Sequence, residues 1–82
     1  MSRQEKAVQR LLARPNDFAW GELKTVMQSF GYELTTVGGS GRKFVRQGSK
    51  SFMVHEPHPQ KILKAYQIRA LIEFLRVQGD IQ

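Results

Sequence analysis

The sequence predicts an α+β fold, in which helices cover one face of a three-stranded antiparallel sheet. Apolar residues recur at the helical spacing i, i+3, i+4, i+7 around residues 19–30 and again around residues 66–78. Between these segments the pattern changes to the alternation of short strands, which glycine-rich turns separate. We expect residues 1–82 to form one domain, because a chain of this length supports only one small core.

The first expected helix covers residues 2–13. Ser2 can cap it, because Glu5 follows three residues later as in a capping box. Pro15 ends it, since proline cannot donate a backbone hydrogen bond and disfavours helix at the residue before it. Its apolar residues form one narrow stripe: Ala7, Val8, Leu11 and Leu12.

Two further helices bracket the strands. The second starts at Ala19 or Trp20 and ends at Phe30, before Gly31, and the last covers about 66–78. We place the three strands at residues 32–37, 43–47 and 50–55, with a glycine turn at 38–41 and a tight hairpin turn at 48–49. The alternation puts Phe44 and Arg46 on one face of the second strand, and Lys43 and Val45 on the other.

Positive charge is concentrated in the middle of the chain. The protein has 13 Lys and Arg against 7 Asp and Glu, and between Gly39 and Lys64 the only acid is Glu56. This balance favours an anionic partner, with nucleic acid ahead of a membrane surface; the alternative is charge that only maintains solubility. We expect one exposed patch that faces sugar-phosphate. Its basic residues are Arg42, Lys43, Arg46, Lys50, Lys61 and Lys64.

The turn at residues 38–41 has two interpretations. Its glycines permit backbone angles that other residues avoid, so exposed amides and the Ser40 hydroxyl could approach a phosphate closely. The alternative is a flexible hairpin loop. Phe18, Trp20, Tyr32 and Tyr66 likewise could stack on bases, although aromatic residues in so small a domain usually belong to its core.

Both histidines are candidates for proton transfer. His55 ends the third strand, and His58 lies between Pro57 and Pro59. An imidazole can take a proton from a ribose 2′-hydroxyl and return one to a leaving oxygen, so that RNA is cleaved through its own 2′-oxygen without metal. The alternative is two polar surface groups. Two histidines with no cysteine and one nearby acid are too few for a tight zinc site, so we predict no metal and no cofactor.

Several classes of protein have no support in the sequence. No Walker-type loop, nucleophile elbow or paired carboxylates occur, which leaves kinase, hydrolase and glycosidase interpretations without motifs. The polar N-terminus lacks the apolar segment of a signal peptide, and no apolar stretch approaches the ~20 residues needed to span a bilayer. We therefore expect a cytoplasmic protein without a membrane partner.

These motifs together resemble the HicA family of toxin-antitoxin toxins, also called YcfA-like proteins. The resemblance covers roughly residues 20–81 and leaves the first helix outside. The motifs that carry it are, in order, Phe30-Gly31-Tyr32, Gly39-Ser40, Pro57 with His58, the stretch Lys64-Ala65-Tyr66-Gln67-Ile68-Arg69, and Gly79-Asp80-Ile81.

The resemblance implies a fold like the double-stranded-RNA-binding domain, with the order α-β-β-β-α in a core at residues 18–82 and an extra helix at 2–14. It also implies mRNA endonuclease activity and a cognate antitoxin. The family's catalytic histidine directly follows the Gly-Ser pair, a position that Gly41 occupies here. Glycine transfers no proton. Either His58 or His55 has taken over the chemistry, or the protein cleaves poorly, or it only binds.

We thus predict an RNA-binding protein of the HicA type that acts as a ribonuclease toxin or a weakened relative. His58 is the first candidate for proton transfer and His55 the second. The first helix could be a homodimer or partner surface through Val8, Leu11 and Leu12. The alternative is a non-catalytic module that binds RNA or an antitoxin-like protein. The expected RNA-binding residues are Gly39, Ser40, Arg42, Lys43, Arg46, Lys50 and Lys64.

Overall fold

A computed structural model describes residues 3–82 of the chain and confirms the α+β class and the expected order of elements. Ser2, the expected helix cap, lies outside the described residues. The elements are α1 Arg3–Leu12, α2 Trp20–Ser29, β1 Glu33–Thr36, β2 Gly41–Val45, β3 Phe52–His55 and α3 Ala65–Val77.

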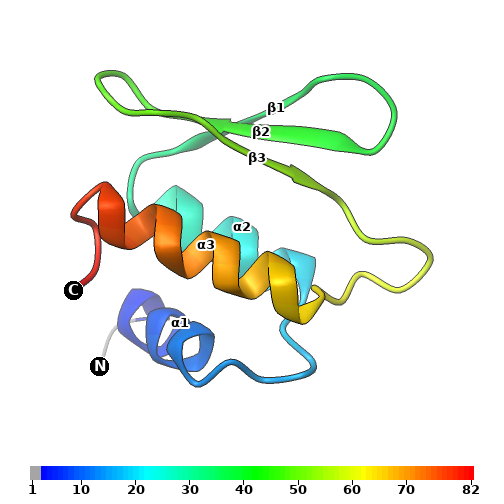
Figure 1. The fold of residues 1–82 in the computed structure, drawn as a ribbon, viewed down its shortest axis with the longest axis horizontal. Helices are drawn as coiled ribbons and strands as arrows, with labels where there is room; N and C mark the ends of the chain where they lie inside the picture. The colour runs from blue at the N-terminus through cyan, green and yellow to red at the C-terminus, as the bar shows by residue number, and fades with distance from the viewer. Residues whose placement is uncertain (1–2) are drawn as a thin grey trace.

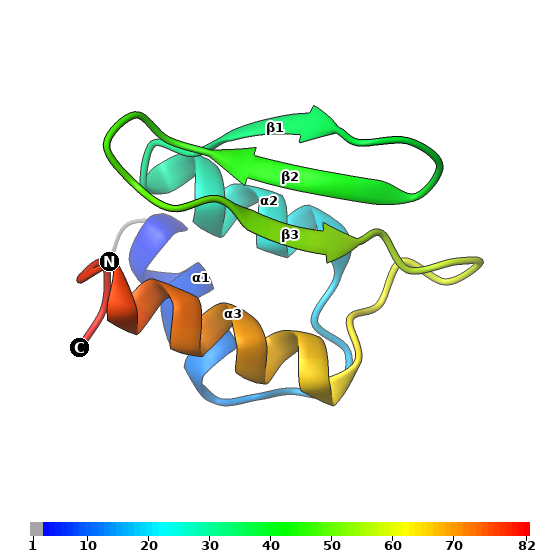
Figure 2. The same ribbon diagram turned by 45° about the horizontal axis from the view of Figure 1, so that its top comes forward.

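The three strands form an antiparallel sheet in the order β1-β2-β3, with one face covered by helices and the other open. Figures 1 and 2 show α2 and α3 side by side beneath the sheet. In the register, Leu34, Phe44 and Phe52 form a cross-strand row on the helix side. The neighbouring row of Thr35, Lys43 and Met53 points the other way, because successive side chains alternate between the two faces.

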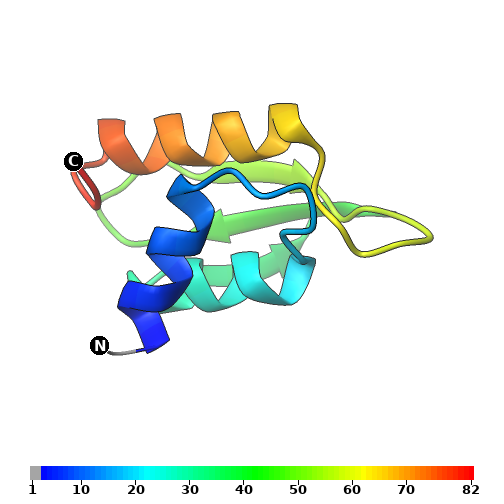
Figure 3. The same cartoon turned by 90° about the horizontal axis from the view of Figure 1, so that it is seen from below.

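Helix α1 packs on α2 and α3 from the side away from the sheet, as the view from below shows (Figure 3). Leu11 has no exposed surface, and Ala7 and Val8 pack against the core. The apolar stripe that we considered as a homodimer or partner surface is therefore largely used within the chain. Leu12, 39% exposed, is its outward-facing member, and a homodimer through this helix stays a prediction.

One buried apolar cluster connects all three helices to the sheet. Phe18, Trp20 and Tyr32 are at most 5% exposed, so three of the four aromatic residues that we considered for base stacking belong to this core. The other members are Leu11, Leu23, Val26, Met27, Phe44, Phe52, Val54, Leu63, Ile68, Leu71, Ile72 and Leu75.

The second strand begins two residues earlier than we predicted. Gly41 belongs to β2 and pairs with His55, and its carbonyl accepts a hydrogen bond from the Val37 N–H at 3.1 Å. The pattern misplaced this residue in the turn because glycine is uncommon within strands. A β-carbon here would lie 3.0 Å from Val37 Cγ2 and 3.2 Å from the Gly38 carbonyl, so a larger residue would displace the turn.

Two backbone hydrogen bonds hold the irregular segment between β3 and α3 in place. The Trp20 N–H donates to the Lys61 carbonyl and the Leu63 N–H donates to the Phe18 carbonyl, both at 2.8 Å. The segment before α2 thus acts as a short pairing partner for the segment that leads into α3. Within residues 3–82, no helix has both the length and the apolar character that crossing a membrane requires.

Candidate nucleic-acid interface

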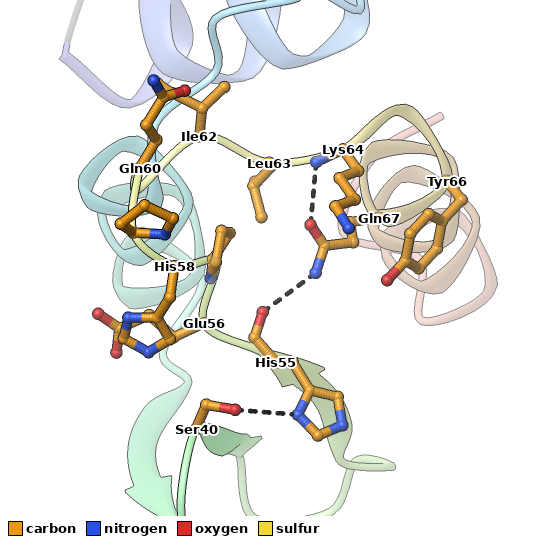
Figure 4. A pocket seen from close by; sticks show the side chains of 12 residues that line it. Ser40, His55, Glu56, His58, Gln60, Ile62, Leu63, Lys64, Tyr66 and Gln67 are labelled. Atoms are coloured by element: carbon orange, nitrogen blue, oxygen red, sulfur yellow. Dashed lines mark hydrogen bonds between the residues drawn. The ribbon is translucent and has the colours of Figure 1, made fainter.

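A groove of about 640 Å³ lies where the end of β3, the segment after it and the start of α3 meet (Figure 4). It contains both histidines of the chain together with two of the expected phosphate-binding residues, Ser40 and Lys64. Its lining residues lie between positions 40 and 67, and they meet because the glycine turn and the N-terminus of α3 approach the same end of the sheet. Glu56, Tyr66 and Gln67 also line it.

His55 lies at the C-terminal end of β3, directly across the ladder from Gly41. Its Nδ1 is 3.4 Å from the Ser40 hydroxyl oxygen. Its side chain shares the open face of the sheet with Met53, because both alternate with the buried Val54. Gly41 has no side chain to place beside this imidazole, and Val37 and the Gly38 carbonyl lie close to where its β-carbon would be. The resemblance assigns the catalytic histidine to position 41, and the residue directly across from Gly41 in β3 is His55.

Gln67 fixes the backbone of His55 relative to α3. Its side chain is 6% exposed, its Nε2 donates to the His55 carbonyl at 3.0 Å, and its Oε1 accepts from the Lys64 N–H at 2.9 Å (Figure 4). Sequence reasoning missed this residue. An amide at the third position of a helix is the capping signature that would have indicated it, and it would also have placed the start of α3 at Ala65.

His58 belongs to a different set of contacts. Its Nδ1 accepts a hydrogen bond from the Lys61 ammonium at 3.1 Å, and the same ammonium donates to Glu56 Oε2 at 2.6 Å. The hydrogen bond from Lys61 holds the pKa of the Glu56 carboxyl below its usual value. In Figure 4 the His58 ring lies beside Glu56, on the opposite side of the connecting segment from the His55 ring. The groove therefore contains both histidines without bringing their rings together.

Arg42 and Arg46 do not lie on an open surface. Arg42 shares a face of β2 with Phe44, which points toward the helices, and Arg46 follows the end of this strand. Arg42 donates to Glu56 Oε1 at 3.1 Å and through Nη1 to the carbonyls of Gly39 and Gly41. It therefore braces the turn beside the groove.

Arg46 takes part in a second cluster, the Arg46–Asp80 clamp, which consists of Arg46, Asp80 and Tyr32. Arg46 Nη1 donates to Asp80 Oδ1 at 2.8 Å and to the Phe30 carbonyl at 2.9 Å, and its guanidinium lies 4.2 Å from the centroid of the Tyr32 ring. The Tyr32 hydroxyl donates to Asp80 Oδ2 at 2.6 Å. Burial, followed by the hydrogen bond to Asp80, raises the pKa of the Tyr32 phenol. The clamp joins the end of α3 to the sheet.

The expected single patch of positive charge is therefore wrong as a description of the surface. Two of its arginines are paired with carboxylates, and Lys61 is paired with Glu56. Lys43 lies on the open face of the sheet, Lys50 precedes β3 at the end of the sheet away from His55, and Lys64 lines the groove. The physical reason is strand alternation, which turns Arg42 to the helix side of β2 and Lys43 to the open side.

Tyr66 is the aromatic residue that remains available to a ligand. It is 58% exposed and lines the groove on the same side as Lys64 and the His55 ring (Figure 4). An exposed phenol ring beside a cation suits stacking on an unpaired base. Among the described residues, no three His, Asp or Glu side chains form a group that could hold a metal ion.

Comparison with known families gives a match over most of the chain. The model of a family described as the HicA toxin of bacterial toxin-antitoxin matches residues 20–77. The matched segment comprises α2, the three strands and α3, and leaves α1 outside. No curated protein and no solved structure gives a significant match.

Proposed function

The chain belongs to the HicA toxin family of bacterial toxin-antitoxin systems, and we propose that it is a cytoplasmic, metal-independent endoribonuclease that cleaves mRNA in the groove. The observation that carries this proposal is the position of His55, which lines the groove beside Ser40 and directly across from Gly41. The family also implies a cognate antitoxin that binds the protein.

His55 is the proposed general base. Its Nδ1 is near Ser40, and its Nε2 makes no hydrogen bond within the described chain and is free to take the proton of a ribose 2′-hydroxyl. The 2′-oxygen then attacks phosphorus and the bond from phosphorus to the 5′-oxygen breaks. The leaving 5′-oxygen takes up a proton from water, and the products are a 2′,3′-cyclic phosphate and a 5′-hydroxyl. The Lys64 ammonium is available in the same groove to stabilise the charge that develops on the phosphate.

His58 has the second role, the reverse of the order that we expected from the sequence. Because the Lys61 ammonium can only donate, the His58 Nδ1 accepts, and in the neutral ring the proton is on Nε2. His58 is therefore suited to donate a hydrogen bond to a phosphate oxygen, and less suited to accept a proton.

Three lysines and the glycine turn are the proposed contacts to the RNA backbone. Lys43, Lys50 and Lys64 form no ion pair within residues 3–82, which leaves their ammonium groups available to phosphates. Gly39 and Ser40 provide the turn beside the groove. Arg42 and Arg46 support this surface from below through their carboxylate partners and make no direct phosphate contact in our proposal.

RNA cleavage by the purified protein tests the proposal. We expect cleavage in the presence of EDTA, with cyclic phosphate ends. His55→Ala should reduce the rate by about 10²-fold or more, as loss of a general base does, and His58→Ala should reduce it less. Gln60→Ala is the matched control, because it is an exposed residue of the same groove outside the proposed chemistry. Full activity of His55→Ala would refute the assignment of the base.

A second candidate function is a non-catalytic module that binds its antitoxin. Two observations favour it: the position of the family's histidine holds Gly41, and the open face of the sheet exposes Val37 and Met53, at 46% and 64%. These two side chains line one shallow pocket of about 250 Å³ together with His55. Protein that leaves RNA intact at high concentration, and whose complex with the antitoxin is weakened by Met53→Ser, would establish this function instead.

A further inference from the structure

A second cavity adjoins the groove, at the start of α3. It measures about 390 Å³, and the loop after α1 forms one of its walls. Leu63 and Lys64 line both cavities, so the second lies next to the groove that contains His55. Its principal lining residues are Arg14, Asn16, Leu63, Lys64, Ile68 and Arg69.

The cavity is cationic and contains no compensating acid. Arg14, Lys64 and Arg69 line it, and no Asp or Glu does. None of these three side chains forms an ion pair within the part of the chain that the structure describes, whereas Arg10, Arg42 and Arg46 all do. All three residues are exposed, so their positive charges are accessible to an anion.

Arg14 also has an unusual backbone conformation. Its φ of 53° is the left-handed conformation that glycine adopts most easily, and it is the one non-glycine residue of the described chain with a positive φ. An arginine at the end of α1 thus occupies a position that the backbone alone would assign to glycine.

We propose that this second cavity binds a backbone phosphate of the RNA strand whose scissile bond lies in the groove. The inference rests on the proposed function and extends it to a longer substrate. The shared residue Lys64 favours RNA over an acidic peptide, because a strand that leaves the groove past Lys64 meets Arg69 and Arg14 next. The apolar wall formed by Leu63 and Ile68 suits a ribose or base beside that phosphate.

The loop after α1 then has a role in RNA binding, and α1 holds that loop against α3. Arg14 lies before residue 20, where the family match begins, so this phosphate contact is an addition to the shared fold. The extension then enlarges the footprint on RNA by at least one nucleotide without altering the groove.

The salt dependence of RNA binding tests this inference. Each phosphate contact to a single strand contributes about 0.7 to the slope of log affinity against log salt, which corresponds to about fivefold between 1 M and 0.1 M salt. Arg14→Gly and Arg69→Gln should each lower the slope by about 0.7 and weaken binding about fivefold at 0.1 M salt. Arg14→Gly suits the local φ, so its melting temperature should not fall.

The control is Arg76→Gln, in the last turn of the same helix and away from the cavity. The probe is a single-stranded RNA with 2′-O-methyl riboses, which binds without being cleaved. A polyglutamate peptide provides the comparison with an acidic protein partner.

Each outcome decides the question. If wild type binds RNA and both cavity variants behave like Arg76→Gln, the inference is overturned and the proposed function stands. If Arg14 is needed for polyglutamate but not for RNA, the cavity is a protein contact and the inference is overturned. If wild type shows no salt-dependent RNA affinity, both the proposed function and this inference fail. A reduced slope for both variants, with the control unchanged, supports the second phosphate site.

Discussion

Replacing Asp80 by alanine should destabilise the protein far more than replacing Asp17, although each aspartate is paired with an arginine at 2.8 Å. The two carboxylates differ in burial, since the Asp80 side chain is 11% exposed and the Asp17 side chain is 68% exposed. Exposed pairs contribute little because water and salt screen them. Asp80 also accepts a hydrogen bond from the Tyr32 hydroxyl, so the comparison tests burial and this hydrogen bond together.

The expected magnitude follows from the Arg46–Asp80 clamp. Asp80→Ala removes the acceptor of the 2.6 Å hydrogen bond from the Tyr32 hydroxyl, and leaves that hydroxyl only a longer contact of 3.4 Å with Ser49. A hydrogen bond to a charged group contributes about 1.5–3 kcal/mol, so we take about 2 kcal/mol for this bond alone. For a domain of this size the melting temperature should then fall by about 8–16 °C. Loss of the ion pair with Arg46 adds to this effect.

Urea and thermal unfolding, followed by fluorescence, provide the assay, because Trp20 is the only tryptophan and is 5% exposed. We expect Asp17→Ala to unfold close to wild type and Asp80→Ala to unfold well below it. Equal destabilisation by the two substitutions would refute the assignment of the clamp as a buried structural unit.

Three further predictions concern the clamp and the contacts around the groove. Arg46→Gln should lower the urea midpoint and leave the salt slope of RNA binding unchanged, because Arg46 is bound to Asp80. Lys64→Gln should lower the salt slope and leave the urea midpoint unchanged, because Lys64 is a proposed phosphate contact. The pKa of Glu56 is lowered by Lys61 from 4.5, so its contribution to stability should be present at neutral pH and be lost as the pH falls below 4.5; Glu56→Gln should flatten this part of a plot of urea midpoint against pH. Gln67→Glu keeps the acceptor for the Lys64 N–H but loses the donor to the His55 carbonyl, so cleavage should slow while α3 remains folded, as kinetics and circular dichroism would report.

The sequence was sufficient for the elements and their order because those signals are local. The i, i+3, i+4, i+7 spacing in α2 and α3 and the alternation in β3 each depend on a few consecutive residues. The ends of elements were less secure. Gly41 was placed in the turn because its strand partner, His55, is 14 residues away and the pairing cannot be read from propensity.

The distribution of charge could not be predicted, because it depends on pairs that are distant in sequence. Arg46 and Asp80 are separated by 34 residues, and Arg42 and Glu56 by 14. Alternation already placed Arg46 on the face of Phe44, but the carboxylate that meets it there becomes visible only in the fold. The groove could not be predicted for the same reason, because Ser40, His55 and Tyr66 are distant in sequence and meet only through the sheet and α3.

The segment that matches the family is shorter than the segment that packs into one core. The family match stops at residues 20 and 77, whereas Leu11 and Phe18 on one side and Asp80 on the other are packed into the interior or bound to it. A fragment cut to the matched residues would uncover the underside of α2 and α3 and deprive Tyr32 of its acceptor. Any minimal version of the protein that retains its melting behaviour must therefore include both flanks.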